Sequence, residues 1–93
     1  MILLSPDAVE DVARFRTFLD QRNPDAARRA LTLIWTAIDR LQEFTDLGMR
    51  TEDAEIRQLM VRFRSSGYIV RYSALPGGDI LITRIWHGRE ART

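Results

Sequence analysis

The sequence contains no cysteine and only one histidine, His87. Without cysteine there can be no disulfide, no thiolate nucleophile and no cysteine-ligated metal. The single histidine has no acidic or cysteine neighbours at ligand spacing, so it offers no metal site. The one glycine pair, Gly77-Gly78, has the spacing of a hairpin turn and not of a phosphate-binding loop. We therefore expect neither a metal nor a cofactor.

Long apolar runs are also missing, since none approaches the roughly 20 residues that would span a bilayer. The first five residues are too short and too uncharged for a signal peptide. We therefore expect a cytoplasmic protein without membrane contact. A chain of 93 residues is expected to form one domain, residues 1–93, whose core is too small for a deep enclosed cavity. Its function should reside on a surface, in a shallow groove or at a strand edge.

Lysine is absent as well, so all 14 cationic side chains are arginines. Residues 1–55 carry seven of them against eleven acidic residues, and residues 56–93 carry seven against two, giving net charges of −4 and +5. The C-terminal part could therefore attract an acidic peptide or a phosphate backbone. A GC-rich genome would account for this use of arginine. So would bidentate capture of carboxylates or phosphates, which arginine performs better than lysine.

Two helices are predicted after a short strand at residues 2–4. Ser5-Pro6-Asp7 and Asn23-Pro24-Asp25 each combine an N-cap, a proline at the first helical position and an acid in the first turn. Apolar residues follow both signals at helical spacing, and few residues separate the two stretches, which favours an antiparallel hairpin. The residues expected in the core, three of them from later strands, are Ala8, Val12, Phe15, Leu19, Leu31, Ile34, Ile38, Leu41, Leu59, Val61 and Val70.

The C-terminal part of the chain has the apolar period of strands. Residues 45–55 have no clear period and are interpreted as a loop. Strands are then predicted at residues 56–63, 68–74 and 80–86, separated by turns. The alternation slips at Thr83-Arg84, which indicates a β-bulge. The predicted order is β-α-α-β-β-β, an α+β fold in which a helical hairpin packs on a small, mostly antiparallel sheet.

Several short motifs follow one another along this pattern. They are Leu4-Ser5-Pro6-Asp7-Ala8, Leu47-Gly48 with Arg50 close behind, Ile56-Arg57-Gln58-Leu59, Gly67-Tyr68-Ile69-Val70-Arg71-Tyr72, Ile80-Leu81-Ile82 and Ile85-Trp86-His87-Gly88-Arg89-Glu90. In this order they resemble the RelE/ParE toxin superfamily over residues 2–90, and its ParE-like branch in particular. The resemblance implies a RelE/ParE-like fold and the toxin of a type II toxin–antitoxin pair. It also implies a cognate ParD-like antitoxin, whose tail wraps around the toxin and holds it inactive.

The superfamily that the chain resembles divides between two activities. RelE-like members cut mRNA on the ribosome, whereas ParE-like members inhibit DNA gyrase by protein–protein binding. RNA cleavage needs a base, an acid and cations around the phosphate, and arginine is a poor base because its pKa exceeds about 12. RelE-like nucleases resemble one another in an arginine where this chain has Ile69, and some of them use lysines that it lacks. The sequence therefore favours gyrase inhibition without enzymatic activity.

Two alternatives to gyrase inhibition stay open. One is a ribosome-dependent mRNA endoribonuclease that uses His87 and Arg89, because Arg89 matches the C-terminal arginine of such enzymes. Tyr68, Tyr72 and the acids are the other side chains able to transfer a proton in that case. The second alternative is a diverged, non-toxic partner of an antitoxin.

Five residues are predicted to bind the antitoxin. Phe18 and Trp35 flank the apolar stripes of their helices, where they either receive an antitoxin helix or pack at the edge of the core. Arg62, Arg71 and Arg84 should lie on the polar face of the sheet, where they either contact antitoxin carboxylates or are merely solvated.

The target-binding residues are expected at the C-terminal end. The ParE-like resemblance makes that end part of the toxic surface, so His87, Arg89 and Arg92 are the candidate contacts. His87 could instead close the sheet by a hydrogen bond to the backbone. We expect no direct sequence-specific DNA binding by this chain.

Overall fold

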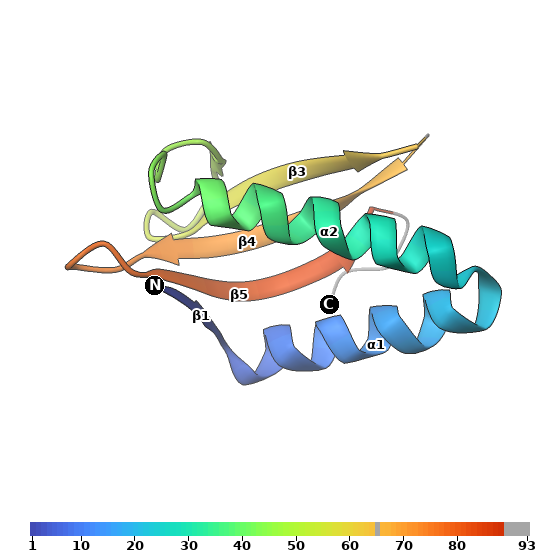
Figure 1. The fold of residues 1–93 in the computed structure, drawn as a ribbon. Coiled ribbons are helices and arrows are strands. Elements are labelled where there is room, and N and C mark those ends of the chain that lie inside the picture. The colour runs from blue at the N-terminus through green and yellow to red at the C-terminus, as the bar shows by residue number, and fades with distance from the viewer. Residues whose placement is uncertain (65, 89–93) are drawn as a thin grey trace.

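The computed structural model describes residues 1–64 and 66–88, apart from the side chains of residues 18–22. Its elements follow one another in the order β1 (Ile2–Leu4), α1 (Pro6–Arg22), α2 (Pro24–Arg40), β2 (Met49–Arg50), β3 (Arg57–Phe63), β4 (Ser66–Ala74) and β5 (Ile80–His87). Figure 1 shows α2 lying across one face of the sheet and α1 running beside β5. The predicted helical hairpin on a sheet is thus confirmed.

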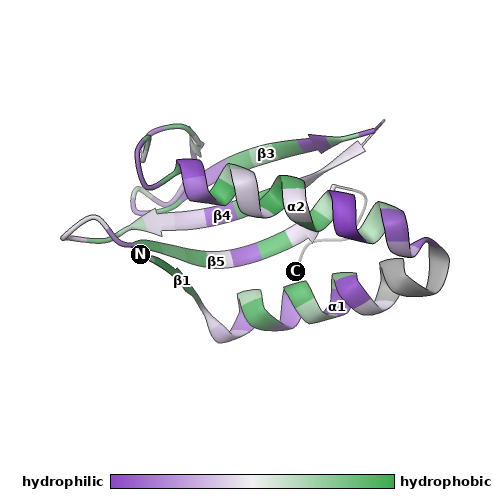
Figure 2. Ribbon diagram, viewed as in Figure 1, coloured by the Kyte–Doolittle hydropathy of each residue, from purple (hydrophilic) through white to green (hydrophobic). Residues whose placement is uncertain are grey.

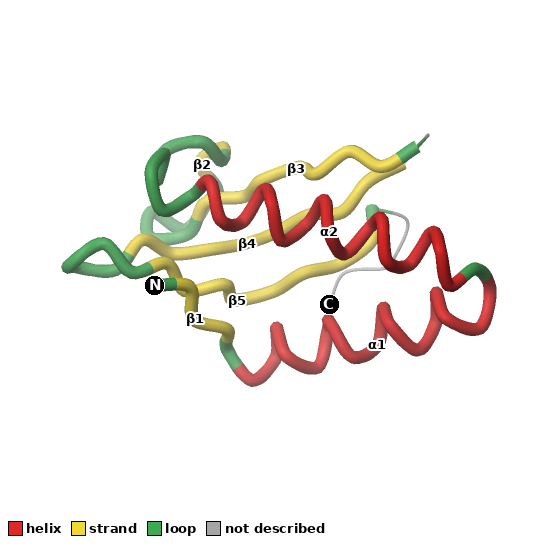
Figure 3. Tube along the Cα trace, viewed as in Figure 1, coloured by secondary structure: helices red, strands yellow, loops and turns green. Residues whose placement is uncertain are grey.

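The five strands form one mixed sheet in the order β1-β5-β4-β3-β2. β1 pairs in parallel with β5, and the other three pairs are antiparallel. One strand was not predicted: Met49 and Arg50 pair with Gln58 and Arg57 inside the segment that was interpreted as a loop. Figure 3 shows β2 as this short stretch between α2 and β3. Two residues are too few to produce a periodicity, so the sequence pattern could not reveal them.

Both helices begin at the capping residues that the sequence indicates. The Oγ of Ser5 accepts a hydrogen bond from the backbone N–H of Ala8 at 3.0 Å, and the Oδ1 of Asn23 accepts one from Ala26 at 3.1 Å. These side chains satisfy N–H groups that have no partner within the helix. Because Asn23 alone separates α1 from α2, the chain must reverse at once, and the helices form a hairpin.

The core lies between the helical hairpin and the sheet. In Figure 2 β1 and much of β3 and β5 are coloured as apolar, and a polar stretch interrupts β5. Seven predicted core residues are buried, namely Ala8, Phe15, Ile34, Ile38, Leu41, Val61 and Val70. Val12, Leu31 and Leu59 are only half-buried, and the side chain of Leu19 lies outside the described part of the chain.

The buried side of α1 differs from the predicted stripe. Ala8, Asp11 and Phe15 are the buried residues of its first three turns, and Val12 lies at the margin. A carboxylate therefore lies among the buried residues of α1, which an apolar period alone does not predict. Among the described residues, no helix is both long and apolar enough to cross a membrane.

The predicted β-bulge is present in β5. Arg71 of β4 pairs with Arg84 and Tyr72 pairs with Ile82, which leaves Thr83 as the extra residue. The insertion lets Ile82 and Ile85, three positions apart, both reach the core, where each is fully buried. The strands consequently keep one helix-covered face and one helix-free face along their length; in the described chain, no helix packs on the second.

Candidate functional site

The β5 bulge is held by a buried carboxylate from α1. Asp11 is 1% exposed. Its Oδ2 accepts hydrogen bonds from the backbone N–H of Ile85 at 2.8 Å and from the Nε of Arg84 at 2.9 Å. Its Oδ1 accepts from the Nη2 of Arg84 at 3.2 Å and from the Nη1 of Arg14 at 2.9 Å. Asp11 therefore fixes the bulge to the helix through a bidentate arginine pair and one backbone donor.

The ionisation of Asp11 follows from these contacts. Burial raises the pKa of the carboxyl, but the hydrogen bonds from Arg84, Ile85 and Arg14 outweigh burial and hold the pKa below its usual value. The carboxylate is thus charged at neutral pH. Sequence reasoning missed this residue; the available signal was an acid three positions after Ala8 on the side of the helix that faces the sheet.

Thr83, the extra residue of the bulge, forms hydrogen bonds with Ser5 before α1 and with the backbone of β4. The Oγ of Ser5 donates to the carbonyl of Thr83 at 2.8 Å, and the Oγ1 of Thr83 donates to the carbonyl of Arg71 at 3.2 Å. Arg84, predicted as an antitoxin contact, has its guanidinium bound to Asp11. Its first role in the structure is therefore to join α1 to β5.

Tyr72 holds the loop after α2. Its hydroxyl donates to the carbonyl of Thr45 at 2.7 Å and accepts from the N–H of Gly48 at 2.9 Å. A Cβ at Gly48 would lie 2.7 Å from the Tyr72 ring, so only glycine fits there. Burial raises the pKa of Tyr72, which keeps the phenol protonated. Tyr72 therefore joins β4 to the loop after α2 through a neutral phenol.

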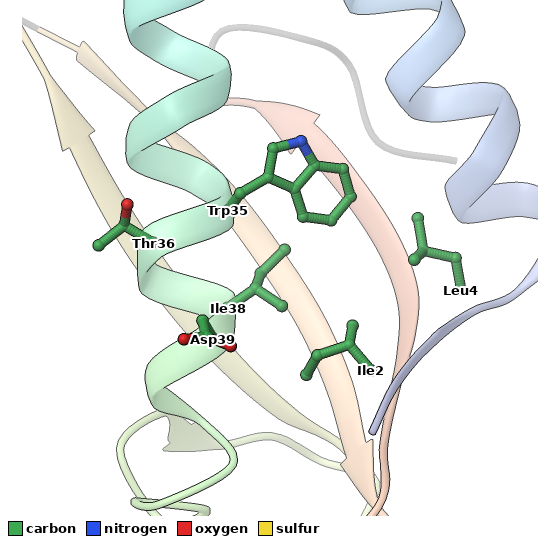
Figure 4. A pocket seen from close by; sticks show the side chains of 6 residues that line it. All are labelled: Ile2, Leu4, Trp35, Thr36, Ile38 and Asp39. Atoms are coloured by element: carbon green, nitrogen blue, oxygen red, sulfur yellow. The ribbon is translucent and has the colours of Figure 1, made fainter.

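An open groove of about 490 Å³ lies between α2 and β1. Its lining residues are Ile2, Leu4, Trp35, Thr36, Ile38 and Asp39. Figure 4 shows Trp35 and Ile38 pointing from α2 toward the β1 side chains. Trp35 is 38% exposed, so a large part of the indole is available for contact. Phe18, the other predicted apolar contact, lies outside the described side chains.

Arg62 and Arg71 lie with a row of apolar side chains on the helix-free face. Met60, Ile69 and Trp86 are cross-strand neighbours on β3, β4 and β5. Arg71 lies over the Trp86 ring at 5.3 Å, and its Nε donates to Gln58 at 3.1 Å. Arg62 alternates with Val61 and is exposed on the same face as Met60. This face therefore combines cationic and apolar side chains.

His87 lies on the other, helix-covered face. Its ring contacts Tyr68 edge-on at a centroid distance of 5.2 Å, and Tyr68 in turn contacts Phe15 of α1 at 5.2 Å. The sheet thus separates the imidazole from Arg62 and Arg71. The other predicted target contacts, Arg89 and Arg92, lie outside the described residues.

The predicted antitoxin-binding residues do not form one surface. Trp35 lies in the groove on the helical side, whereas Arg62 and Arg71 lie on the helix-free face. Arg84 lies at the bulge with Asp11. A partner that contacted all of them would have to wrap around the molecule.

A family model described as the ParE toxin of the type II toxin–antitoxin system, parDE, matches residues 2–92. The chain belongs to the ParE toxin family. It is therefore the toxin of a type II toxin–antitoxin system, as the resemblance predicts. Membership of this family implies that its partner is an antitoxin.

Relatives of this ParE-family toxin include two proteins of Caulobacter vibrioides. Toxin RelE3 is 37% identical over 89 residues, covering 96% of this chain and 95% of the relative. Toxin RelE1 is 37% identical over 91 residues, covering 98% and 96%. The chromosomal ParDE toxin–antitoxin system from P. aeruginosa contains a chain that matches with a TM-score of 0.70 and 19% identity over 92% of each chain. That likeness shows the same fold.

Proposed function

We propose that this toxin inhibits DNA gyrase by protein–protein binding and performs no RNA chemistry. A cognate ParD-like antitoxin neutralises it. The observation that supports this most directly is the position of His87. RNA cleavage requires a proton acceptor close to the phosphate that cations hold. His87 packs against Tyr68 on the helix-covered face, and Arg62 and Arg71 occupy the opposite face.

Two further features argue against a ribonuclease site on the helix-free face. Ile69, at the position where RelE-like nucleases resemble one another in an arginine, is part of the apolar row between Met60 and Trp86. Tyr72 is buried and bound to the loop after α2, so it does not reach that face. The two Caulobacter relatives carry the name RelE, so the ribonuclease is the alternative to be tested.

The proposed antitoxin contact is the groove beside Trp35. Its walls are mostly apolar, and its volume suits several side chains of an amphipathic helix. Tryptophan is also one of the residue types enriched among the side chains that dominate interface energies. Trp35→Ala should therefore weaken the antitoxin complex at least tenfold. Leu33→Ala is the control, because Leu33 is an exposed apolar residue of the same helix that does not line the groove, and it should leave the affinity nearly unchanged.

The decisive experiment compares gyrase and ribosomes as targets. Purified toxin should block DNA supercoiling by gyrase and leave mRNA intact on translating ribosomes. His87→Ala, if folded, should remain toxic, because a binding inhibitor does not need a proton-transfer group. Removal of residues 88–93 should abolish toxicity and preserve the antitoxin complex. Ribosome-dependent cleavage that disappears in His87→Ala or Arg89→Ala would establish the ribonuclease instead.

A further inference from the structure

We infer that Arg71 is the centre of a preformed carboxylate-binding site on the helix-free face, which takes an acidic side chain of the antitoxin. This inference rests on the antitoxin partnership in the proposed function, but not on gyrase as the target. The site lies on the opposite face from the Trp35 groove.

The guanidinium of Arg71 is held in a fixed orientation. It stacks over the Trp86 ring at 5.3 Å, and its Nε donates to the Oε1 of Gln58 at 3.1 Å. Stacking on an aromatic face and one hydrogen bond together restrict a side chain that is otherwise mobile. The Arg71 side chain is 29% exposed, so a partner can reach the guanidinium from solvent. Because Arg71 is already ordered, binding a partner there would cost little additional side-chain entropy in the toxin.

A carboxylate of the chain itself already approaches this guanidinium. The Oε1 of Glu52 lies 4.0 Å from the Nη2 of Arg71, beyond hydrogen-bond distance, and the Glu52 side chain is 82% exposed. Glu52 therefore neutralises part of the positive charge of Arg71 but does not form a hydrogen bond with its guanidinium. Its carboxylate marks the side from which a better-placed carboxylate of a partner would enter. Glu52 thus acts as a weak internal competitor for the site.

The surroundings of Arg71 define the partner's chemistry. Met60 is 56% exposed next to the site, and its flexible thioether adapts to an apolar neighbour. Arg62, two residues further along β3, adds a second cation on the same face. The fitting segment is therefore acidic, with an apolar side chain beside the carboxylate. Charge complementarity favours the antitoxin's tail as this segment, since residues 56–93 carry a net charge of +5.

The test measures the affinity of purified toxin for its cognate antitoxin, obtained from the co-expressed complex, by calorimetry at low and high salt. Arg71→Met keeps the aliphatic volume but removes the donors, and should weaken binding about tenfold or more. Arg71→Lys should fall in between, because lysine keeps the charge without the planar donor pair. Arg28→Gln, an exposed arginine on α2 that pairs with Asp25, is the matched control and should change affinity less than about twofold.

Glu52→Gln provides the sharper measurement, since an exposed loop side chain can be changed without unfolding the protein. It should tighten antitoxin binding about two- to fivefold, with a smaller gain at high salt. In an Arg71→Met background the gain should disappear. An equal gain in both backgrounds would mean that Glu52 acts only through general repulsion, and the proposed site would be wrong.

The remaining outcomes identify other partners. If Arg71→Met leaves antitoxin affinity unchanged but abolishes gyrase inhibition, Arg71 contacts the target and the inference about the antitoxin fails while the proposed function stands. If it abolishes binding of a single-stranded RNA probe instead, both fail. If Trp35→Ala alone weakens the complex, the groove is the antitoxin site and the Arg71 site is rejected.

Discussion

The two faces of the sheet carry different side chains on the same strands. On the helix-covered face, Val61 and Val70 pack under Ile34 and Ile38, and even the lone histidine contacts a buried tyrosine. On the helix-free face, at neighbouring positions of the same strands, the sheet presents Met60, Arg62 and Arg71. Neighbouring residues of one strand therefore lie in different surroundings, since Val61 is buried under the helices and Met60 and Arg62 are exposed. Substitutions on the two faces should accordingly change different measurable quantities.

The largest effect is expected in the core. Ile38 is fully buried and also lines the groove. Ile38→Ala should lower the free energy of unfolding by about 4 kcal/mol, because it removes packed methyl groups and leaves a cavity. Urea denaturation measures the change. Leu33→Ala on the exposed side of the same helix is the control and should cost less than about 1 kcal/mol. Similar losses for the two variants would contradict the assignment of the core.

Asp11→Ala should have the second largest effect. It leaves the N–H of Ile85 and the guanidinium of Arg84 without their carboxylate. Removing one partner of a buried pair costs about 3–5 kcal/mol, and we expect about 3 because Arg84 keeps access to water. Asp25→Ala removes an exposed ion pair with Arg28 and should cost less than about 0.5 kcal/mol. Equal urea midpoints for the two variants would show that the bulge needs no anchor.

A smaller effect is expected from pH. Burial raises the pKa of Asp11, but its hydrogen bonds bring the folded-state pKa below the unfolded value of about 4. The folded state then binds fewer protons, so this stabilisation is complete above about pH 4 and is lost as pH falls through the folded-state pKa. The stability difference between wild type and Asp11→Asn, measured by urea denaturation at a series of pH values, should therefore shrink as the pH falls below about 4. A constant difference would exclude this linkage.

The smallest effects should come from the helix-free face. Met60→Ala and Arg62→Ala should each leave the free energy of unfolding within about 0.5 kcal/mol of wild type, because both side chains are exposed. The antitoxin affinity of the same variants can be measured on the same samples. A large loss of stability in either variant would show that the exposed side chains of this face also contribute to the fold, as the buried Ile69 and Trp86 do.

Much of this architecture could be predicted from local signals. The caps at Ser5 and Asn23, the strand periodicity and the bulge at Thr83 are all confirmed. β2 was missed because two residues give no period. Asp11 was missed because a search for apolar periodicity treats a carboxylate as exposed. Its burial is favourable because Arg84 and the N–H of Ile85, both on the distant β5, donate three hydrogen bonds to it.

The sequence alone determined which residues alternate, where each helix begins and that the cations are all arginines. These properties depend on neighbours along the chain. Only the tertiary structure decided the use of each arginine: Arg84 binds Asp11, more than 70 positions away, whereas Arg71 stacks on Trp86. It also placed His87 and Arg71 on opposite faces, because the register of β4 with β5 and the position of the bulge determine which side chains share a face.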